Sequence, residues 1–270
     1  MDTIPAPDQS RTLRQYGAFN GLGLWTLYQR EVGRFLKVWM QTVFAPVVTT
    51  LLFMTVFKLA FGDRGQLTGD FENLRYNDFL APGLIMMAIL QNAFANTSSS
   101  LVQAKFNATH VDFLMPPLSP LELTIAFLGG AVTRALLIAL ICGLAIQLSG
   151  LANLPIRHIW PILWFSLTSA VILGGIWADK FDHLAAVTNF VIVPLTFLSG
   201  TFYDVKVMVE PFESIAHLNP VFYMIDGYRY GHIGVANGSL QVGVIYTGLL
   251  ALASVIAVWV MFRDGYKLKA

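Results

Sequence analysis

Six long apolar runs divide this 270-residue chain, and each is close to the length that crosses a bilayer. The hydrocarbon core of a membrane is about 30 Å thick, which about 20 apolar residues span as a helix. Because lipid offers no hydrogen-bond partners to the backbone, such runs must be helical there. The sequence therefore predicts an all-α membrane protein with six transmembrane helices, at about residues 39–61, 79–99, 121–148, 159–178, 184–203 and 242–262.

Composition supports this class and excludes another. Hydrophobic residues make up 56% of the chain and charged residues 12%, whereas an average soluble domain is about 25% charged. The net charge of +1 argues against nucleic acid as a partner, because binding to phosphates requires a strongly basic surface. The single cysteine, Cys142, lies inside the third run, so it cannot form an intramolecular disulfide and is expected to be a small packing residue.

Residues 1–38 form a polar, basic leader with one amphipathic segment, Phe19–Val38. Apolar residues recur there near helical spacing, with charged residues between them, a pattern typical of a helix that lies flat at the membrane interface. The alternative is a soluble leader helix. The apolar positions are Leu24, Leu27, Tyr28, Val32 and Phe35, and the charged ones are Arg30, Glu31, Arg34 and Lys37.

Lys and Arg residues concentrate at the two ends of the chain. The positive-inside rule places such ends in the cytoplasm, and an even number of spans requires both ends to lie on one side. We therefore expect both the leader and the tail, residues 263–270, to be cytoplasmic.

Arg134 is the one charge near the middle of a predicted span, where an arginine costs about 3 kcal/mol on the insertion scale. One hypothesis is a structural arginine that is bonded to an amide of a neighbouring helix, such as Asn92 or Asn96. The other is a direct role in transport or gating. Gly130, one turn earlier, would let another helix approach closely.

The second run ends in the polar stretch QNAFANTSSS, residues 91–100. Small and hydroxyl side chains of this kind hold helices together in membranes, and they also line polar paths. Both interpretations stay open.

Motifs of catalysis are missing from the sequence. No predicted span has a central acid, which a proton-coupled pump would use, and no HExxH or phosphate-binding GxxxxGK[ST] motif occurs. The sequence therefore predicts no catalytic and no metal site, and the chain is not expected to be an enzyme.

The segment between the second and third runs predicts a short helix at about residues 107–116. Val111, Leu114 and Met115 share one face of it, and Pro116-Pro117 ends it. Ser119 is suited to cap the next helix, with Pro120 at its first position and Glu122 in its first turn.

These segments resemble the integral membrane subunits of ABC-2 type exporters, a group that includes permeases for drugs, nodulation-type lipo-oligosaccharides, O-antigen and teichoic acid polymers. The resemblance rests on a basic residue, a short helix and a P-L-S-P-x-E type entry to the third span, together with an L-S-G-x-x-[FY] exit from the fifth span and an L-N-P before the sixth. Here these are Lys105, residues 111–115, 117–122, 198–203 and 218–220. Thr109 to Asp112 departs from the family's Gly-Thr-[LI]-Glu-like run.

The resemblance implies a type V exporter architecture in a bacterial inner membrane. Two permeases would work with two copies of a separate ABC ATPase, which binds ATP and Mg, so that this chain needs no cofactor. The short helix would be a cytoplasmic coupling helix seated in a groove of the ATPase, next to the interfacial helix. The implied coupling residues are Lys105, Asn107, His110, Val111, Asp112, Leu114 and Met115.

The resemblance also implies a central pathway between two copies of the chain, surrounded by membrane lipids, for an amphipathic, lipid-linked or glycan substrate or a hydrophobic drug. Its implied residues are Gln91, Asn92, Asn96, Thr188, Asn189, Thr196 and Phe197, with Arg134 as the gating candidate.

The stretch after the fifth run predicts two short helices, at about residues 206–232. One alternative is an ordinary extracellular loop; the other is a re-entrant hairpin that closes the outer end of the pathway. The predicted outer-gate residues are Gly200, Glu210, Phe212, Glu213, His217, Asn219 and Pro220.

Two other functions compete with that of an exporter permease. A secondary transporter or channel without an ATPase predicts intramembrane acids or paired broken helices. An intramembrane enzyme predicts acids, His or Ser clustered at one membrane face.

Overall fold

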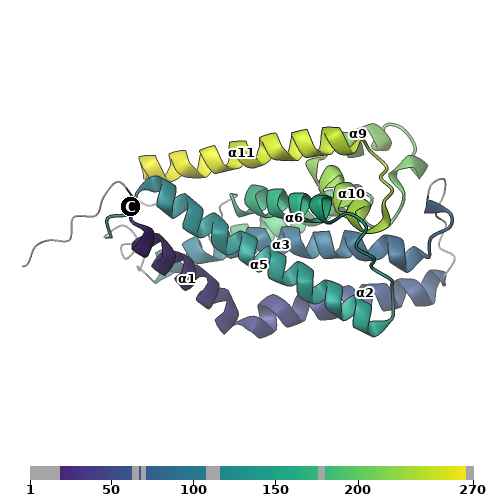
Figure 1. Cartoon of the computed structure of the whole chain (residues 1–270), viewed down its shortest axis with the longest axis horizontal. Helices are drawn as coiled ribbons and strands as arrows, with labels where there is room; N and C mark the ends of the chain where they lie inside the picture. The colour runs from purple at the N-terminus through teal and green to yellow at the C-terminus, as the bar shows by residue number, and fades with distance from the viewer. Residues whose placement is uncertain (1–18, 63–66, 68–70, 108–115, 176–179, 266–270) are drawn as a thin grey trace, which may run out of the picture.

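The computed structural model describes residues 19–62, 67, 71–107, 116–175 and 180–265. Throughout these ranges the regular structure is helical, and the helices lie side by side as one bundle (Figure 1). In chain order the α-helices are α1 (Gly21–Lys37), α2 (Ala45–Phe61), α3 (Tyr76–Phe106), α5 (Pro120–Ser149), α6 (Ile159–Gly174), α7 (Phe181–Val187), α8 (Val193–Leu198), α9 (Phe212–Leu218), α10 (Pro220–Ile233) and α11 (Leu240–Asp264).

Within the described residues, four helices are long and apolar enough to cross a membrane: Met40–Phe61, Tyr76–Ala104, Pro120–Ser149 and Leu240–Asp264. Two shorter apolar helices, Ile159–Gly174 and Asp182–Leu198, fall where the fourth and fifth spans were predicted. The helical class is confirmed, whereas the count of six spans stays a prediction. The structure extends the second predicted span at both ends, because α3 runs from Tyr76 to Phe106.

Helix α3 forms the centre of the bundle, and α2 and α11 lie on opposite sides of it (Figure 1). In the most apolar stretch of each helix, 78% is buried in α3, against 11% in the span that contains α2 and 17% in α11. The outer faces of α2 and α11 are nonetheless apolar, as at Leu52 and Leu249, which are each about 60% exposed. Faces of this kind suit lipid or another apolar surface rather than water.

Two helices of the bundle each contain one π-helical turn directly before a proline. The turns are η1 (Met40–Phe44) and η3 (Thr188–Ile192), and the prolines are Pro46 and Pro194. A proline in a helix has no N–H for the carbonyl four residues earlier, and its ring crowds that carbonyl. Widening the preceding turn relieves this conflict, so both helices stay continuous through their prolines.

The chain between α8 and α11 folds back against the bundle. A 3-10 turn, η4 (Val205–Val207), and α9 precede α10, and most of α10 is buried against α3, α6 and α11. Two short helices were predicted here, and two are present. Their placement within the membrane as a re-entrant hairpin stays a prediction.

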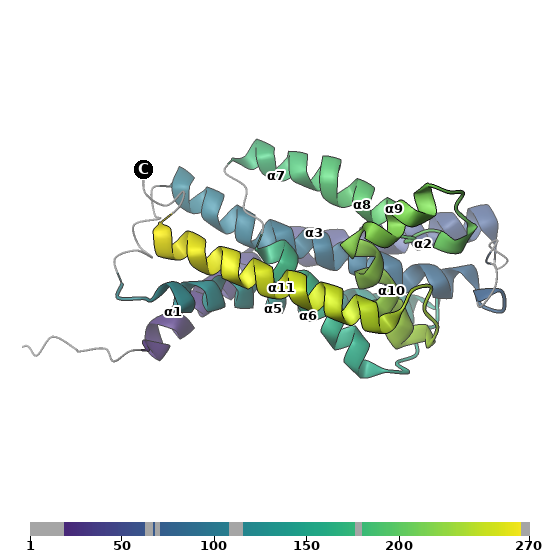
Figure 2. The same ribbon diagram turned by 90° about the horizontal axis from the view of Figure 1, so that it is seen from above.

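The two ends of the bundle hold different helices. The α1 end holds α1, the last turn of α3 and the first turn of α5; the α10 end holds α9, α10 and the first turn of α11 (Figures 1 and 2). Helices α7 and α8 run in line along the bundle, next to α3 (Figure 2).

Candidate functional site

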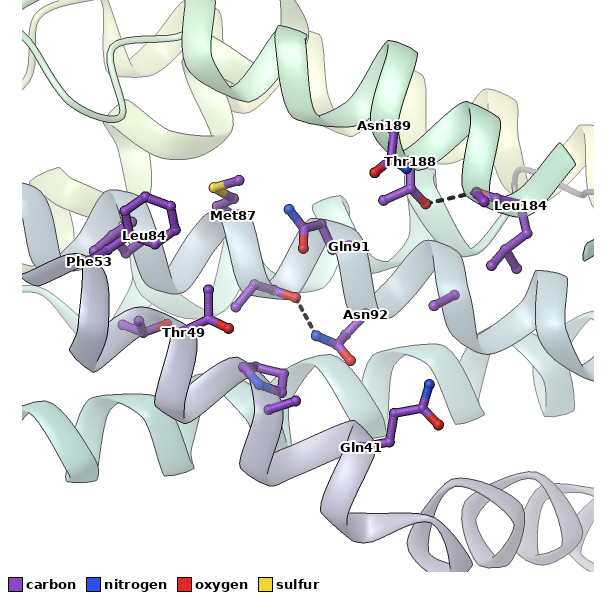
Figure 3. A pocket seen from close by; sticks show the side chains of 16 residues that line it. Gln41, Thr49, Phe53, Leu84, Met87, Gln91, Asn92, Leu184, Thr188 and Asn189 are labelled. Atoms are coloured by element: carbon purple, nitrogen blue, oxygen red, sulfur yellow. Dashed lines mark hydrogen bonds between the residues drawn. The ribbon is translucent and has the colours of Figure 1, made fainter. Parts of the chain in front are cut away.

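A cavity of about 440 Å³ lies between α2, α3 and the α7–η3 segment. Figure 3 shows Gln91 and Asn189 approaching it from α3 and η3, and Thr49 approaching it from α2. The polar residues of its wall are Gln41, Thr49, Thr50, Gln91, Asn92, Thr188 and Asn189, and the remainder are apolar or small. We call this space the polar cavity.

The structure brings together four of the predicted pathway residues, Gln91, Asn92, Thr188 and Asn189, in the wall of the polar cavity. Both π-helical turns border it as well, through Gln41 of η1 and through the two residues from η3. A π-helical turn displaces the residues that follow it around the helix axis and often occurs at a functional site. Here the lining residues Gln41, Thr188 and Asn189 are part of the two turns themselves.

Asn92 connects the polar cavity to Arg134 behind it. The Asn92 amide nitrogen donates to the carbonyl of Ala88 over 2.9 Å. Its oxygen accepts from Nη2 and Nε of Arg134, at 2.8 and 3.2 Å. Arg134 is buried, with 8% of its surface exposed. Its bond to the Asn92 amide agrees with the hypothesis of a structural arginine that is bonded to a neighbouring helix. Arg134 itself is not part of the cavity wall.

Three other predicted pathway residues lie outside the polar cavity. Asn96 is buried at the contact with α1, where its backbone carbonyl accepts from Arg34. The Thr196 hydroxyl is used inside its own helix, on the carbonyls of Ile192 and Val193. Phe197 is 42% exposed and stacks on Phe202.

A buried charge cluster joins α1 to the last turns of α3. Glu31 is 1% exposed; it accepts from the Ser100 hydroxyl over 2.7 Å and forms an ion pair with Arg34 over 3.1 Å. Arg34 also donates to the Asn96 carbonyl over 2.7 Å and to the Ser99 hydroxyl over 2.9 Å. The polar end of the second run therefore holds helices together at Ser99 and Ser100, and lines a polar path at Gln91.

The sequence pattern counted Glu31 among the charged residues between the apolar positions of the leader helix, and it did not foresee that Glu31 is buried. Glu31 lies on the buried face with Leu27 and Phe35, because α1 packs against α5 and α3. Gly130 permits this approach, since a Cβ there would lie 2.9 Å from Cβ of Glu31. The predicted role of Gly130 as a point of close helix contact is confirmed.

The first turns of α1 and α5 are also tied together. The Asn20 side chain caps α1 and donates to the Pro117 carbonyl over 3.4 Å. Glu122 accepts from the backbone amides of Ser119 and Asn20. The predicted cap at Ser119 is confirmed as a full capping box with Glu122.

The predicted coupling helix falls mostly outside the described residues, including His110, Val111, Asp112, Leu114 and Met115. Lys105 belongs to the last turn of α3, and Asn107 directly follows that helix. The coupling assignment of these residues stays a prediction.

Asn219, one of the predicted outer-gate residues, hydrogen-bonds through its side chain to the end of α8 and to the start of α10. Its amide donates to the Ser199 hydroxyl over 2.7 Å and to the Leu195 carbonyl over 2.9 Å, and its oxygen caps α10 at Val221. Pro220 occupies the first turn of that helix. Asn219 therefore attaches the start of α10 to the end of α8.

The other outer-gate residues are more peripheral. Gly200 turns the chain with a φ of 72°, a conformation that glycine adopts readily. Glu210 accepts from the Ser214 hydroxyl, His217 packs edge-on against Phe222, and Phe212 is 54% exposed. Glu213 is half-buried in the first turn of α9.

Sequence reasoning did not single out Arg229. It is 1% exposed and donates to the carbonyls of Gly200 over 2.8 Å and of Phe79 over 3.3 Å. Its guanidinium lies 3.9 Å from the centre of the Phe79 ring. Asp226, one turn earlier and 3% exposed, accepts from the amides of Asn237 and Gly238. The sequence signal that could have indicated this buried site was an acid, Asp226, and a base, Arg229, one turn apart in a segment rich in apolar and aromatic residues.

Comparison with known proteins shows which family this chain resembles. The family model for the ABC-2 type transporter matches residues 23–233. The inner membrane transport permease YadH of Escherichia coli strain K12 is 31% identical over 257 residues, which cover 92% of this chain and 98% of that protein. Nodulation protein J of Rhizobium leguminosarum bv. viciae is 23% identical over 237 residues, covering 85% and 89%.

Proposed function

Because the chain belongs to the ABC-2 type transporter family, we propose that it is the permease subunit of an ATP-driven exporter. In this proposal two copies of the chain form the transmembrane pathway, and two copies of a separate ABC ATPase bind and hydrolyse ATP with Mg. The six predicted spans cross a bacterial inner membrane, with both termini in the cytoplasm.

The polar cavity is the observation that carries this proposal. Its wall contains amide and hydroxyl side chains among apolar ones, and no acid, base or histidine is among the 16 described residues that line it. Such a wall offers hydrogen bonds without fixed charge, which suits an amphipathic, lipid-linked or glycan substrate, or a hydrophobic drug. A proton-coupled transporter would use an ionisable group there, so the alternative of a secondary transporter is less well supported.

The location of the cavity supports a pathway shared by two copies. It opens between α2 and the η3 segment, and Thr49 and Asn189 are exposed beside it. The apolar outer face of α2 continues from this opening, through Val48 and Leu52. A second copy packed on that face would close the cavity and bring two polar walls together.

The contacts at the α1 end suggest how ATP hydrolysis reaches the pathway. Closure of the ATPase would move the coupling segment after α3 and, through Asn20 and Glu122, the first turns of α1 and α5. The Glu31–Arg34 cluster would pass this movement to α3, which carries Gln91 and Asn92. ATP would then shift the population between inward-facing and outward-facing arrangements, since it binds one arrangement more tightly.

The test is reconstitution of the permease with a candidate ABC ATPase, which is sought first in the adjacent reading frame. We expect the pair to co-purify and to hydrolyse ATP in a vanadate-sensitive manner in proteoliposomes. A well-folded permease that neither binds an ATPase nor supports vanadate-sensitive hydrolysis would refute the proposal.

A further inference from the structure

A second cavity, of about 450 Å³, lies between α5, α6 and α10 and shares no residue with the polar cavity. Its wall is apolar along most of its extent, with Leu136, Leu140 and Leu144 from α5 and Ile159, Ile162 and Leu163 from α6. We call it the apolar cavity. Its volume is within the range of pockets that hold small ligands.

The apolar cavity is bordered by side chains that face outward. Leu140 and Leu144 of α5 are 60% and 53% exposed, and Leu163 of α6 is 52% exposed. Helix α5 is long and apolar enough to cross the membrane, so its exposed leucines face hydrocarbon rather than water. The medium next to the opening is therefore lipid.

Two buried polar groups in the wall have no partner among the described residues. Ser166 and His232 both line the cavity and are 1% and 7% exposed. The Ser166 hydroxyl and Nε2 of His232 make no hydrogen bond within the described chain. Buried polar groups in native proteins are almost always paired, because an unpaired one loses its hydration without compensation.

The available hydrogen-bonding chemistry of these two groups follows from their surroundings. Nδ1 of His232 lies 3.0 Å from the Pro155 carbonyl. A carbonyl only accepts, so Nδ1 carries the hydrogen, and Nε2 of the neutral ring is an acceptor. The Ser166 hydroxyl can donate. Together, Ser166 and His232 thus present one donor and one acceptor in a largely apolar space.

We propose that the apolar cavity binds one acyl chain of a bilayer phospholipid. The leucine and isoleucine walls enclose the hydrocarbon, the Ser166 hydroxyl donates to an ester carbonyl, and Nε2 of His232 accepts from the head group. The bilayer supplies this ligand directly at the opening. This site is separate from the transport pathway, and it does not require an ATPase.

The test uses the full chain in vesicles of phosphatidylethanolamine and phosphatidylglycerol that contain phosphatidylethanolamine with a photoactivatable acyl chain. After irradiation, labelled peptides are identified by mass spectrometry. We expect labelling at Leu140, Leu144 and Leu163 to exceed that at Leu249 and Leu252 of α11, which are similarly exposed but lie outside the cavity.

Gly143 provides a variant that fills the apolar cavity. It is part of the wall, and a Cβ added there meets no atom within 4 Å. We expect Gly143→Leu to remove the excess labelling. Gly33→Leu is the matched control, because a Cβ at Gly33 also meets nothing within 4 Å and α1 is not part of this cavity. This control should keep the excess labelling.

Three outcomes would overturn the proposal: equal labelling of the cavity and of α11, unchanged labelling of a folded Gly143→Leu variant, or loss of the excess in both glycine variants. Ser166→Ala gives a separate measurement that does not depend on filling the space. It should lower labelling by the phospholipid probe but not by a photoactivatable alkane. Equal labelling of wild type and Ser166→Ala by the phospholipid probe would contradict the hydrogen bond to the lipid.

Discussion

The carboxylate of Glu122 accepts hydrogen bonds from the backbone amides of Ser119, three residues before it, and of Asn20, 102 residues before it. One side chain therefore completes the cap of α5 and fixes the residue that caps α1. The two helices therefore begin side by side, and α5 begins shortly after the segment that is predicted to contact the ATPase.

Glu122→Ala should release both amides. Loss of a helix cap destabilises by about 0.5–2 kcal/mol, and we expect a value near the upper limit because two helices are affected. The measurement is thermal unfolding of the purified chain in detergent. Glu210→Ala is the control, since Glu210 is exposed and accepts from Ser214 of the adjacent α9. A similar melting temperature for both variants would contradict the shared cap.

The Glu31–Arg34 pair should be much more sensitive to substitution than a surface pair. Removing one partner from a buried ion pair destabilises by about 3–5 kcal/mol, whereas an exposed pair is worth about 0–1 kcal/mol. Because Arg34 is 21% exposed, we expect Glu31→Gln to destabilise the chain by about 3 kcal/mol, the lower limit for a buried pair. Arg75→Gln breaks the i,i+3 pair with Asp78, in which the arginine is 52% exposed, and is the control.

The same two variants test the proposed coupling route. If α1 transmits ATPase closure to α3 through Glu31, the Glu31→Gln complex should hydrolyse ATP without matching transport. Arg75→Gln should keep hydrolysis and transport coupled. Full transport by a folded Glu31→Gln complex would exclude the cluster from the route.

Arg134 can be tested by removing it together with its partner. Asn92→Leu removes the amide oxygen and leaves a buried charge unpaired, so we expect a strong loss of stability. The double variant Asn92→Leu with Arg134→Leu removes the charge as well and should recover most of the stability. Arg134→Leu alone removes the buried charge and keeps Asn92 in the wall of the polar cavity. Transport by this folded single variant then separates the two roles: retained transport supports a structural role for Arg134, and lost transport a gating role.

Apolar run length predicted the helical class and the positions of most long helices, because bilayer thickness sets that pattern whatever the tertiary contacts. Local rules also predicted the cap at Ser119, since capping depends on residues within one turn. The close approach at Gly130 could be foreseen from the missing side chain, although its partner on α1 could not.

The buried charges could not be placed in the same way. Glu31 and Arg229 look like surface residues in sequence, because their burial is compensated by partners far along the chain: Ser100 for Glu31, and Gly200 and Phe79 for Arg229. The helical spacing of apolar residues alone predicts that charged side chains lie on the outer surface of the bundle. Thr196 lies outside the polar cavity, and its hydroxyl bonds within its own helix, a local contact that its residue type alone does not predict.

A bulky side chain in the polar cavity should block transport without unfolding the chain. Ala185 lines the cavity and is exposed, so Ala185→Trp has room to enter it. We expect export to be lost in complementation of a deletion strain, with normal membrane levels. Ala253→Trp on the exposed face of α11 is the control and should complement. Normal export by Ala185→Trp would place the pathway elsewhere.

Arg229 should be needed to hold the α10 segment against the bundle. Its guanidinium donates to the carbonyl of Phe79 in α3 and to the carbonyl of Gly200 in the turn after α8, which a planar fork of donors can reach together. Arg229→Met leaves both carbonyls buried and unpaired, which destabilises by about 1–3 kcal/mol for each group. Arg229→Lys keeps the charge but offers a single point donor, so we expect only partial recovery. Arg157→Met, at an exposed position in the α5–α6 connection, should unfold at the wild-type temperature. Equal thermal unfolding of Arg229→Met and Arg157→Met would show that the two carbonyl bonds do not hold the segment in place.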